Sequence, residues 1–299
     1  MKKTTILTIL IASILFVSCS EKEIDNQLEC TGENYSIEVN RFIKKLTTTQ
    51  TGGLPFIRNY EFTYNSYNLL STVDNYTFNS EAQLNYNYIC SNTVKTIENE
   101  NNVNKYKYSY DSNNRIITYN TRDSYLHDYA LKYIDNKVIA EGKINVNSNI
   151  VITLETNSNG LVTKLSRVDG YSTFDYDANG NMIRAKDFKL DNQLLHDYEI
   201  SYDANPNPFY GQLKASYLER FIHNFNDSAF YGIDIFFRNN QYNFPYLKNN
   251  PIVLEYKNCT SCYSEILKRT YEYDAQNYPV KMEESHYGGP IVIYNYVYN

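Results

Sequence analysis

The chain has 299 residues, and 28 lysine and arginine residues against 34 aspartate and glutamate residues give it a formal net charge of −6 at pH 7. A negative chain lacks the basic face that the phosphate backbone of nucleic acids requires, so we expect no nucleic-acid partner. Hydrophobic residues make up 42% of the chain and include 32 tyrosines but no tryptophan, which excludes a disordered chain and indicates a sizeable folded core.

Residues 1–18 have the pattern of an export signal. Lys2-Lys3 precedes an apolar run over 6–17, which is too short to span a bilayer as a helix. The run ends in Phe16-Val17-Ser18-Cys19, which resembles a bacterial lipobox. The resemblance implies that residues 1–18 are removed and that acyl chains on Cys19 bind the membrane.

Residues 19–34 are predicted to form a flexible tether, because charged and polar linkers stay extended. Its segment Ser20-Glu21-Lys22-Glu23-Ile24-Asp25 resembles the surface-export signal of Bacteroidota lipoproteins. The two resemblances together predict a lipid-anchored outer-membrane protein, and the acidic segment favours exposure on the cell surface.

Four further cysteines remain, and an exported chain favours disulfides among them. One of three possible connectivities joins Cys259 to Cys262 and Cys30 to Cys90. A four-cysteine zinc site usually needs two closely spaced pairs, and a redox cysteine usually begins a helix, so both alternatives are weaker. We expect no metal and no other cofactor.

The body of the chain repeats one pattern, in which aromatic residues alternate with polar ones and an Asp/Asn-rich segment follows. Alternation places the rings on one face of a strand, and Asp, Asn and Gly supply turn conformations, so each copy predicts a β-hairpin. The clearest copies begin at Tyr60, Tyr106, Phe174, Tyr198 and Tyr271, and Leu154-Glu155-Thr156-Asn157 is a copy without the tyrosine.

The copy Tyr176-Asp177-Ala178-Asn179-Gly180-Asn181 resembles the YD repeat of large bacterial surface and toxin-delivery proteins. Over residues 55–299 the chain is more similar to a Bacteroidota lipoprotein family of unknown function with a proposed porin-like β fold. The segments that carry this second resemblance are Asn207-Pro208-Phe209-Tyr210-Gly211, Lys248-Asn249-Asn250-Pro251 and Tyr271-Glu272-Tyr273-Asp274. The resemblance implies a fold but no activity, and Asn277 stands where that family more often has glycine.

Helical spacing interrupts the repeat over residues 211–226, where Leu213, Tyr217, Phe221 and Phe225 fall on one side of a helix. Such a helix could plug one mouth of a curled sheet or cover a sheet edge. The sequence therefore predicts a single all-β domain over 35–299: an antiparallel meander of repeated hairpins, curled into a half-open or closed barrel, with one amphipathic helix inserted.

An unusually aromatic stretch follows this helix and is the best candidate for a ligand-binding patch. Tyrosine gives a large contact area with few torsions to freeze, which suits a glycan or a protein ligand. Alternatively, the tyrosines of the chain are simply strand-core residues whose hydroxyls reach the rim. The candidate patch comprises Phe230, Tyr231, Phe236, Phe237, Tyr242, Phe244 and Tyr246.

Catalytic motifs are lacking: the sequence contains no nucleophile elbow, metalloprotease helix or phosphate-binding loop. The tripeptides His127-Asp128-Tyr129 and His196-Asp197-Tyr198 repeat, but neighbouring strand residues point to opposite faces and do not form an acid–base pair. An enzyme would have to rely on carboxylates such as Asp128 or Asp197 facing a cavity. We expect no catalysis and no catalytic residue.

The predicted strands carry Lys, Glu, Asp and Asn opposite their tyrosines, and neither face suits contact with hydrocarbon. We therefore expect a barrel in water rather than in the bilayer. The leading hypothesis is a non-catalytic binding or adhesion module for a glycan or a protein. The alternative is a periplasm-facing structural or assembly subunit of an outer-membrane complex.

Overall fold

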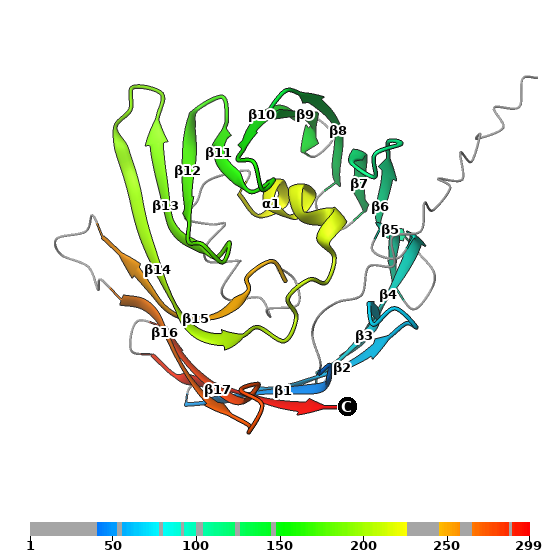
Figure 1. Cartoon of the computed structure of the whole chain (residues 1–299), viewed down its shortest axis with the longest axis vertical. Coiled ribbons are helices and arrows are strands. Elements are labelled where there is room, and N and C mark those ends of the chain that lie inside the picture. Colours follow the sequence, from blue (N-terminus) through cyan, green and yellow to red (C-terminus); the bar gives the residue numbers. More distant parts are fainter. Residues whose placement is uncertain are drawn as a thin grey trace, which may run out of the picture.

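The computed structural model of the protein describes residues 41–52, 56–77, 80–90, 93–99, 104–122, 126–144, 148–225, 245–257, 265–286 and 289–299. These residues form one antiparallel sheet of eighteen strands, whose order follows the chain. The last strand pairs with the first, and the sheet closes into a barrel (Figure 1). The predicted meander is therefore confirmed, and of the two predicted forms the barrel is the closed one.

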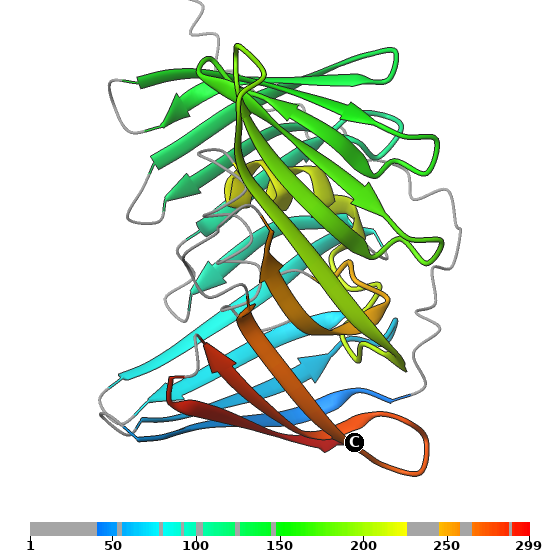
Figure 2. The same ribbon diagram turned by 90° about the vertical axis from the view of Figure 1, so that its left-hand side faces the viewer.

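The strands are joined as successive hairpins and are inclined in the wall (Figure 2). Their bounds are β1 Ile43–Thr51, β2 Ile57–Tyr64, β3 Leu70–Thr77, β4 Ser80–Cys90, β5 Thr93–Asn99, β6 Asn104–Tyr110, β7 Ile116–Arg122, β8 Leu126–Ile134, β9 Lys137–Ile144, β10 Ser148–Thr156, β11 Val162–Ser166, β12 Gly170–Tyr176, β13 Met182–Lys189, β14 Leu194–Pro206, β15 Asn249–Tyr256, β16 Glu265–Tyr273, β17 Pro279–His286 and β18 Ile291–Tyr298.

The two faces of the wall differ as the alternating pattern predicts. Tyr60 and Phe62 on β2 are buried, whereas Glu61 and Thr63, which alternate with them, are exposed. Across the outer face, Lys132 on β8 pairs with Glu141 on β9 at 2.8 Å. The barrel therefore has an aromatic inner face and a charged outer face.

Eight tyrosines close the wall at one end of the barrel, and we call them latch tyrosines. Each hydroxyl donates to a carbonyl among the first three residues of the preceding strand, at 2.6–3.1 Å. The latch tyrosines are Tyr64, Tyr88, Tyr110, Tyr133, Tyr176, Tyr202, Tyr271 and Tyr298. The repeated tyrosine thus serves as a core residue with its hydroxyl at the rim.

Five-residue turns follow β2, β6, β10, β12 and β16 at the same end, which we call the Asx mouth. In the turn after β12, the Asp177 carboxylate accepts from the amides of Asn179 and Asn181, and Gly180 has a φ of 83°. The turn after β16 repeats these bonds from Asp274, with Asn277 at a φ of 65°. Asparagine tolerates this left-handed conformation, so the turn keeps its shape without glycine.

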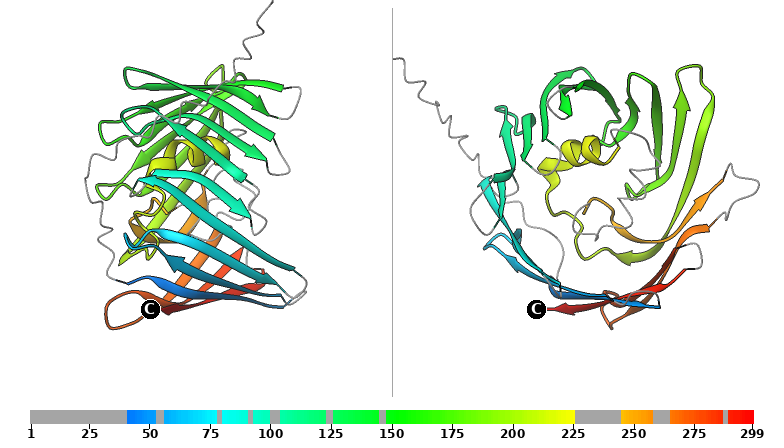
Figure 3. Two further views of the ribbon diagram at one scale, coloured as in Figure 1. Left: turned by 90° about the vertical axis from the view of Figure 1, so that its right-hand side faces the viewer. Right: turned by 180° about the vertical axis from the view of Figure 1, so that it is seen from behind.

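The predicted helix is confirmed within residues 211–226, although it is shorter: a 3₁₀ turn, η1 (Lys214–Ser216), leads into α1 (Tyr217–Phe225). This insert between β14 and β15 lies inside the ring of strands (Figures 1 and 3). Phe221 packs edge-on against Phe174 of the wall, with ring centres 4.7 Å apart, and the ring centres of Phe209 and Phe62 lie 5.3 Å apart. The insert therefore provides the core against which the aromatic inner face packs. None of the helices in the described ranges is long and apolar enough to cross a membrane.

Candidate functional site

The pair β9–β10 departs from the repeat in two ways. Thr156 ends β10 where a latch tyrosine would stand, and its short hydroxyl donates to the Asn136 carbonyl at 3.4 Å. The turn from β8 to β9 has only two residues, Asp135 and Asn136, instead of five. A ring and part of a loop are therefore absent from this sector of the Asx mouth.

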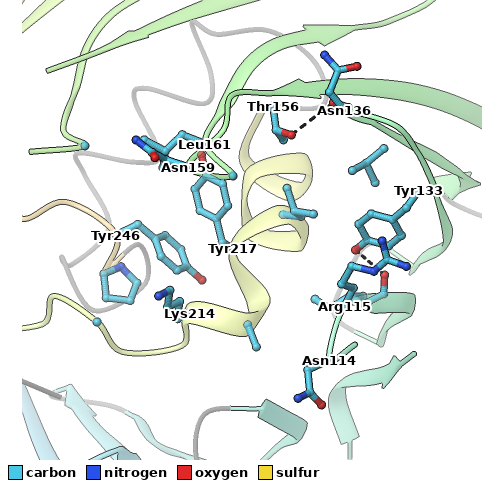
Figure 4. Close-up of a pocket in the computed structure, with 18 of the residues that line it drawn as sticks. Asn114, Arg115, Tyr133, Asn136, Thr156, Asn159, Leu161, Lys214, Tyr217 and Tyr246 are labelled. Carbon is cyan, nitrogen blue, oxygen red and sulfur yellow. Dashed lines mark hydrogen bonds between the residues drawn. The ribbon is translucent and has the colours of Figure 1, made fainter. Parts of the chain in front are cut away.

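A cavity of about 650 Å³ opens in this sector, and we call it the mouth cavity (Figure 4). Its outer wall comes from the turns that join β6 to β13, and its inner wall comes from the insert, at 210–218 and 245–246. Figure 4 shows Tyr217 and Tyr246 on one side, Tyr133 and Arg115 on the other, and Thr156 between them. The volume lies within the range of small-molecule and cofactor sites.

Two segments that the sequence resemblance singled out clamp the base of the insert. The side-chain amide of Asn207 donates to the Leu247 carbonyl at 2.9 Å, and its backbone amide donates to the Lys248 carbonyl at 2.9 Å. Asn250 reaches back to the Pro206 carbonyl at 3.2 Å. These bonds hold the two ends of the insert together, and Gly211 and Pro245 of the cavity wall lie next to them.

A charged pair on α1 faces the aromatic wall inside the barrel. The Glu219 carboxylate accepts from the Tyr108 hydroxyl at 3.3 Å, and the Arg220 guanidinium lies 5.0 Å from the centre of the Tyr106 ring. Burial raises the pKa of Glu219, although Arg220 and the tyrosine hydroxyls oppose the rise. Neither residue lines the mouth cavity, so we assign the pair to the docking of α1.

Four tyrosines line the cavity, and the hydroxyls of three of them are occupied by the protein. Tyr133 is the latch of β8, Tyr217 accepts from the Val162 amide at 3.1 Å, and Tyr246 donates to the Leu213 carbonyl at 2.8 Å. Burial raises the pKa of both Tyr133 and Tyr217 to about 12. These rings therefore offer fixed, neutral, largely apolar surface to a ligand.

The rim of the cavity is polar. The side-chain amides of Asn114, Asn136 and Asn159 are exposed and make no hydrogen bond to any residue that the structure describes. Arg115 is held by Asp111, at 2.8 Å from Nε, and stacks 4.3 Å from the centre of the Tyr133 ring. Lys214 and Asp135 complete the charged groups of the lining.

The described lining offers little for catalysis. Asp135 is its single carboxylate, and it contains no histidine, cysteine or serine. Hydrolysis of a glycosidic bond usually needs two carboxyl groups that flank the bond. No group of three His, Cys, Asp or Glu side chains that could hold a metal lies within the described part of the chain.

Most of the residues predicted as sites from the sequence lie outside the described residues. These are the lipidation residue Cys19, the cysteines Cys30, Cys259 and Cys262, and the aromatic residues Phe230, Tyr231, Phe236, Phe237, Tyr242 and Phe244. Cys90 is the last residue of β4, and its side chain is not described. From the predicted aromatic patch, Tyr246 is placed in the mouth cavity.

The aspartates of the repeated His-Asp tripeptides bond to residues outside the tripeptides. Asp128 is exposed and accepts from the Asn120 amide at 2.8 Å. Asp197 accepts two hydrogen bonds from Arg184, at 2.8 and 2.7 Å, while the His196 ring lies 3.3 Å from a different carboxylate, that of Asp187. Neither Asp128 nor Asp197 lines the mouth cavity.

Two buried carboxylates, Asp187 and Glu284, occupy equivalent places in the repeat. Each lies five residues after a residue whose carbonyl accepts a hydrogen bond from a latch tyrosine, Met182 for Asp187 and Pro279 for Glu284. Burial opposes the charge on Glu284, but Arg269 at 2.6 Å and His286 at 2.9 Å hold its pKa below the ordinary value. The paired carboxylates satisfy a polar layer of the inner face, away from the mouth cavity.

Comparisons with known proteins show a resemblance of overall structure alone. No family model matches the sequence, and no curated protein matches it. A porin-like protein from Bacteroides uniformis is 13% identical, with 86% of this chain and 98% of that chain covered and a TM-score of 0.46. A porin-like protein from Bacteroides vulgatus is 12% identical, with 87% and 99% covered and a TM-score of 0.43.

A weaker match is the structure of TcdB2-TccC3-Cdc42, which is 7% identical, with 56% of this chain and 12% of that chain covered and a TM-score of 0.27. Similarity at these levels assigns neither a function nor a site to this chain. We therefore infer the function from the cavity itself.

The mouth cavity was missed in the sequence analysis, although one signal for it was visible. Leu154-Glu155-Thr156-Asn157 stood out as a copy of the repeat without its tyrosine. Had the absence of a tyrosine at Thr156 been interpreted as a missing ring, it would have identified the sector of the wall that contains the cavity.

Proposed function

We propose that the protein is a lipid-anchored, non-catalytic binding module of the outer membrane whose ligand, a glycan or a protein, enters the mouth cavity. The observation that carries the proposal is the coincidence of the cavity with the one pair of strands, β9–β10, in which Thr156 replaces the latch tyrosine. A tyrosine occupies this position in eight strand pairs, and it is absent only from the pair beside the cavity. This coincidence supports a ligand-binding role for the cavity.

The proposed location, the outer membrane, rests on the sequence, through the lipobox-like segment that ends at Cys19. The outer face of the wall supports a barrel held in water on a tether, because ion pairs such as Lys281–Glu272, at 2.9 Å, lie across neighbouring strands. Charged groups of this kind are costly against hydrocarbon.

Thr156→Tyr tests the binding role directly. The new ring is expected to occupy the part of the cavity beside β9–β10 and its hydroxyl to donate to the Asn136 carbonyl, as in the latched pairs. The full protein, purified in detergent, is screened against an immobilised glycan panel and purified extracellular proteins. We expect the wild type to bind at least one probe and the variant to lose at least tenfold in affinity.

The matched control is Thr270→Tyr, which adds the same ring to the exposed outer face of β16. Circular dichroism shows whether both variants fold. Equal binding by wild type, Thr156→Tyr and Thr270→Tyr contradicts a ligand in the mouth cavity. Turnover of a bound glycan by the wild type contradicts the non-catalytic role.

Cys19→Ala tests the proposed location. We expect the wild type to incorporate labelled palmitate, to fractionate with the outer membrane and to be cleaved by protease added to whole cells, whereas the variant loses the label. Protection of the wild type from protease would instead favour a periplasm-facing assembly subunit. Labelling that persists in the variant contradicts the anchor.

A further inference from the structure

Given the binding role proposed for the mouth cavity, we infer that its ligand is the terminal part of a neutral glycan chain. The cavity combines unpartnered amides at its rim, aromatic rings at its sides and aliphatic side chains at its base. Each of these features matches one property of a sugar, and together they fit poorly with an acidic ligand or with a flat protein surface.

The rim amides match hydroxyl groups. An asparagine side chain offers one carbonyl acceptor and two N–H donors, and a hydroxyl both donates and accepts. Asn114, Asn136 and Asn159 come from three successive turns, and none of their side-chain amides bonds to another described residue. Amides on three sides of an opening can therefore pair with hydroxyls that point in different directions from one sugar ring.

The turns that carry these amides are rigid, which lowers the entropy cost of binding. Asp111 accepts from the backbone amides of Asn113 and Arg115, at 2.9 and 3.0 Å. Asn157 accepts in the same way from Asn159 and Leu161, at 3.0 and 3.1 Å. The backbone that carries Asn114 and Asn159 is thus fixed before a ligand arrives.

The charge of the lining favours a neutral ligand. Arg115 is neutralised by Asp111, with Nη2 2.7 Å from the carboxylate, and it covers one face of Tyr133. Of the other two charged groups, Lys214 is positive and Asp135 is negative, so their formal charges cancel. A carboxylate or sulfate on the ligand would find no group set aside for it.

The base and sides of the cavity match the C–H surface of a sugar. Ile116 and Val138 are buried members of the lining, and Leu218 of α1 lies beside them. Tyr217 and Tyr246 stand edge to face, with ring centres 5.0 Å apart, and their hydroxyls are already bonded. A ligand meets carbon here, and amides only at the rim.

The shape favours a chain end over the middle of a chain. The polar rim is exposed and the aliphatic base is buried, so a ligand enters from solvent and its end reaches toward the inside of the barrel. A protein partner that binds through a surface usually covers about 800 Å² on each side, whereas a cavity of about 650 Å³ encloses a group of small-molecule size.

The experiment uses the full protein in detergent and an array of neutral oligosaccharides, acidic oligosaccharides and peptides, at low and high salt. We expect binding to neutral glycans, inhibition by their terminal disaccharides, and little change with salt because no ion pair is formed. Asn136→Ala and Asn159→Ala should each weaken binding about three- to tenfold, the loss of one or two hydrogen bonds.

Asn113→Ala is the matched control. Asn113 occupies in its turn the place that Asn159 occupies in the next, it is exposed, and it does not line the cavity, so affinity should be unchanged. Binding only to acidic glycans or peptides, with loss in Thr156→Tyr, overturns the neutral-glycan inference and leaves the binding role intact. If Thr156→Tyr reduces binding to none of the probes, the binding role itself is overturned.

Discussion

The barrel wall contains two kinds of strand pair. In eight of them a tyrosine ring fills the space behind the turn and its hydroxyl ties down a carbonyl of the preceding strand, as Tyr176 does at 2.7 Å from Val162. In β9–β10, Thr156 makes the equivalent bond at 3.4 Å without a ring, and the mouth cavity lies there. In a repetitive wall, function is to be sought where the repeat is broken, because the latched pairs fill this position with a side chain of their own.

Alkaline pH should break the latched group as a whole, and this is the largest effect that we expect. Burial raises the pKa of the latch Tyr133 to about 12 and that of the latches Tyr176 and Tyr202 well above the ordinary value of 10.0. A raised pKa in the folded state gives stability that is complete below pH 10 and is lost as the pH rises through 12.

Tyrosinate absorbance and circular dichroism, followed together against pH, check this prediction. Ionisation of the buried tyrosines should coincide with the loss of β structure. A barrel that keeps its β signal after all tyrosines have ionised would contradict the role of the latches.

Tyr110→Thr gives a latched strand pair, β5–β6, the threonine that β9–β10 has at this position. Tyr110 is 8% exposed and its hydroxyl bonds the Val94 carbonyl, so we expect a loss of about 3–5 kcal/mol in the free energy of unfolding, as for other large-to-small changes in a core. Urea unfolding measures it, and the control Tyr110→Phe, which removes only the hydroxyl, should lose about 1 kcal/mol. A loss below that of Tyr110→Phe would mean that the ring is dispensable.

Gly180→Ala tests whether the turns behind the latches require a left-handed residue. A Cβ at this position has ordinary van der Waals space, 3.6 Å from Leu161, so the cost is that of the φ of 83° alone, about 1–2 kcal/mol. Asn277→Gly, at the equivalent position of another turn, should change stability by a few tenths of a kcal/mol in the favourable direction. Thermal unfolding of both variants checks the pair, and equal effects would refute the equivalence of the turns.

Thr156→Tyr should raise the free energy of unfolding by up to about 1 kcal/mol, because it adds buried ring surface and a shorter hydrogen bond in a sector with room for both. Chemical denaturation provides the measurement. A loss of more than about 2 kcal/mol would show that the β9–β10 sector differs from the latched pairs in more than the missing ring.

Much of the fold follows from local pattern. Alternating rings such as Tyr106, Tyr108 and Tyr110 identify strands, and the Asp/Asn segments identify turns, because both signals lie within a few residues of the chain. The insert was also recognisable, since Phe221 and Phe225 keep helical spacing. Closure was not, because it depends on β1 and β18, which lie more than 200 residues apart and carry no local mark of their pairing.

The site was less predictable because the mouth cavity lies where a latch tyrosine is absent, rather than where a recognisable motif is present. The lining brings together turns from 114 to 180 with an insert at 210–246, and only the closed barrel sets that arrangement. The aromatic stretch chosen from the sequence contributes Tyr246, and its other candidate residues lie outside the described residues. Thr156 was the signal within reach, and its meaning depended on knowing that tyrosine fills the other pairs.

The most direct test of the ligand site is a crystal structure of the protein soaked with the neutral oligosaccharide that it binds most tightly. We predict electron density for the terminal sugar in the mouth cavity, against Tyr217 and within hydrogen-bond distance of the Asn136 and Asn159 amides. Density on the outer face of the wall or at the opposite end of the barrel, with the mouth cavity holding only water, would contradict it.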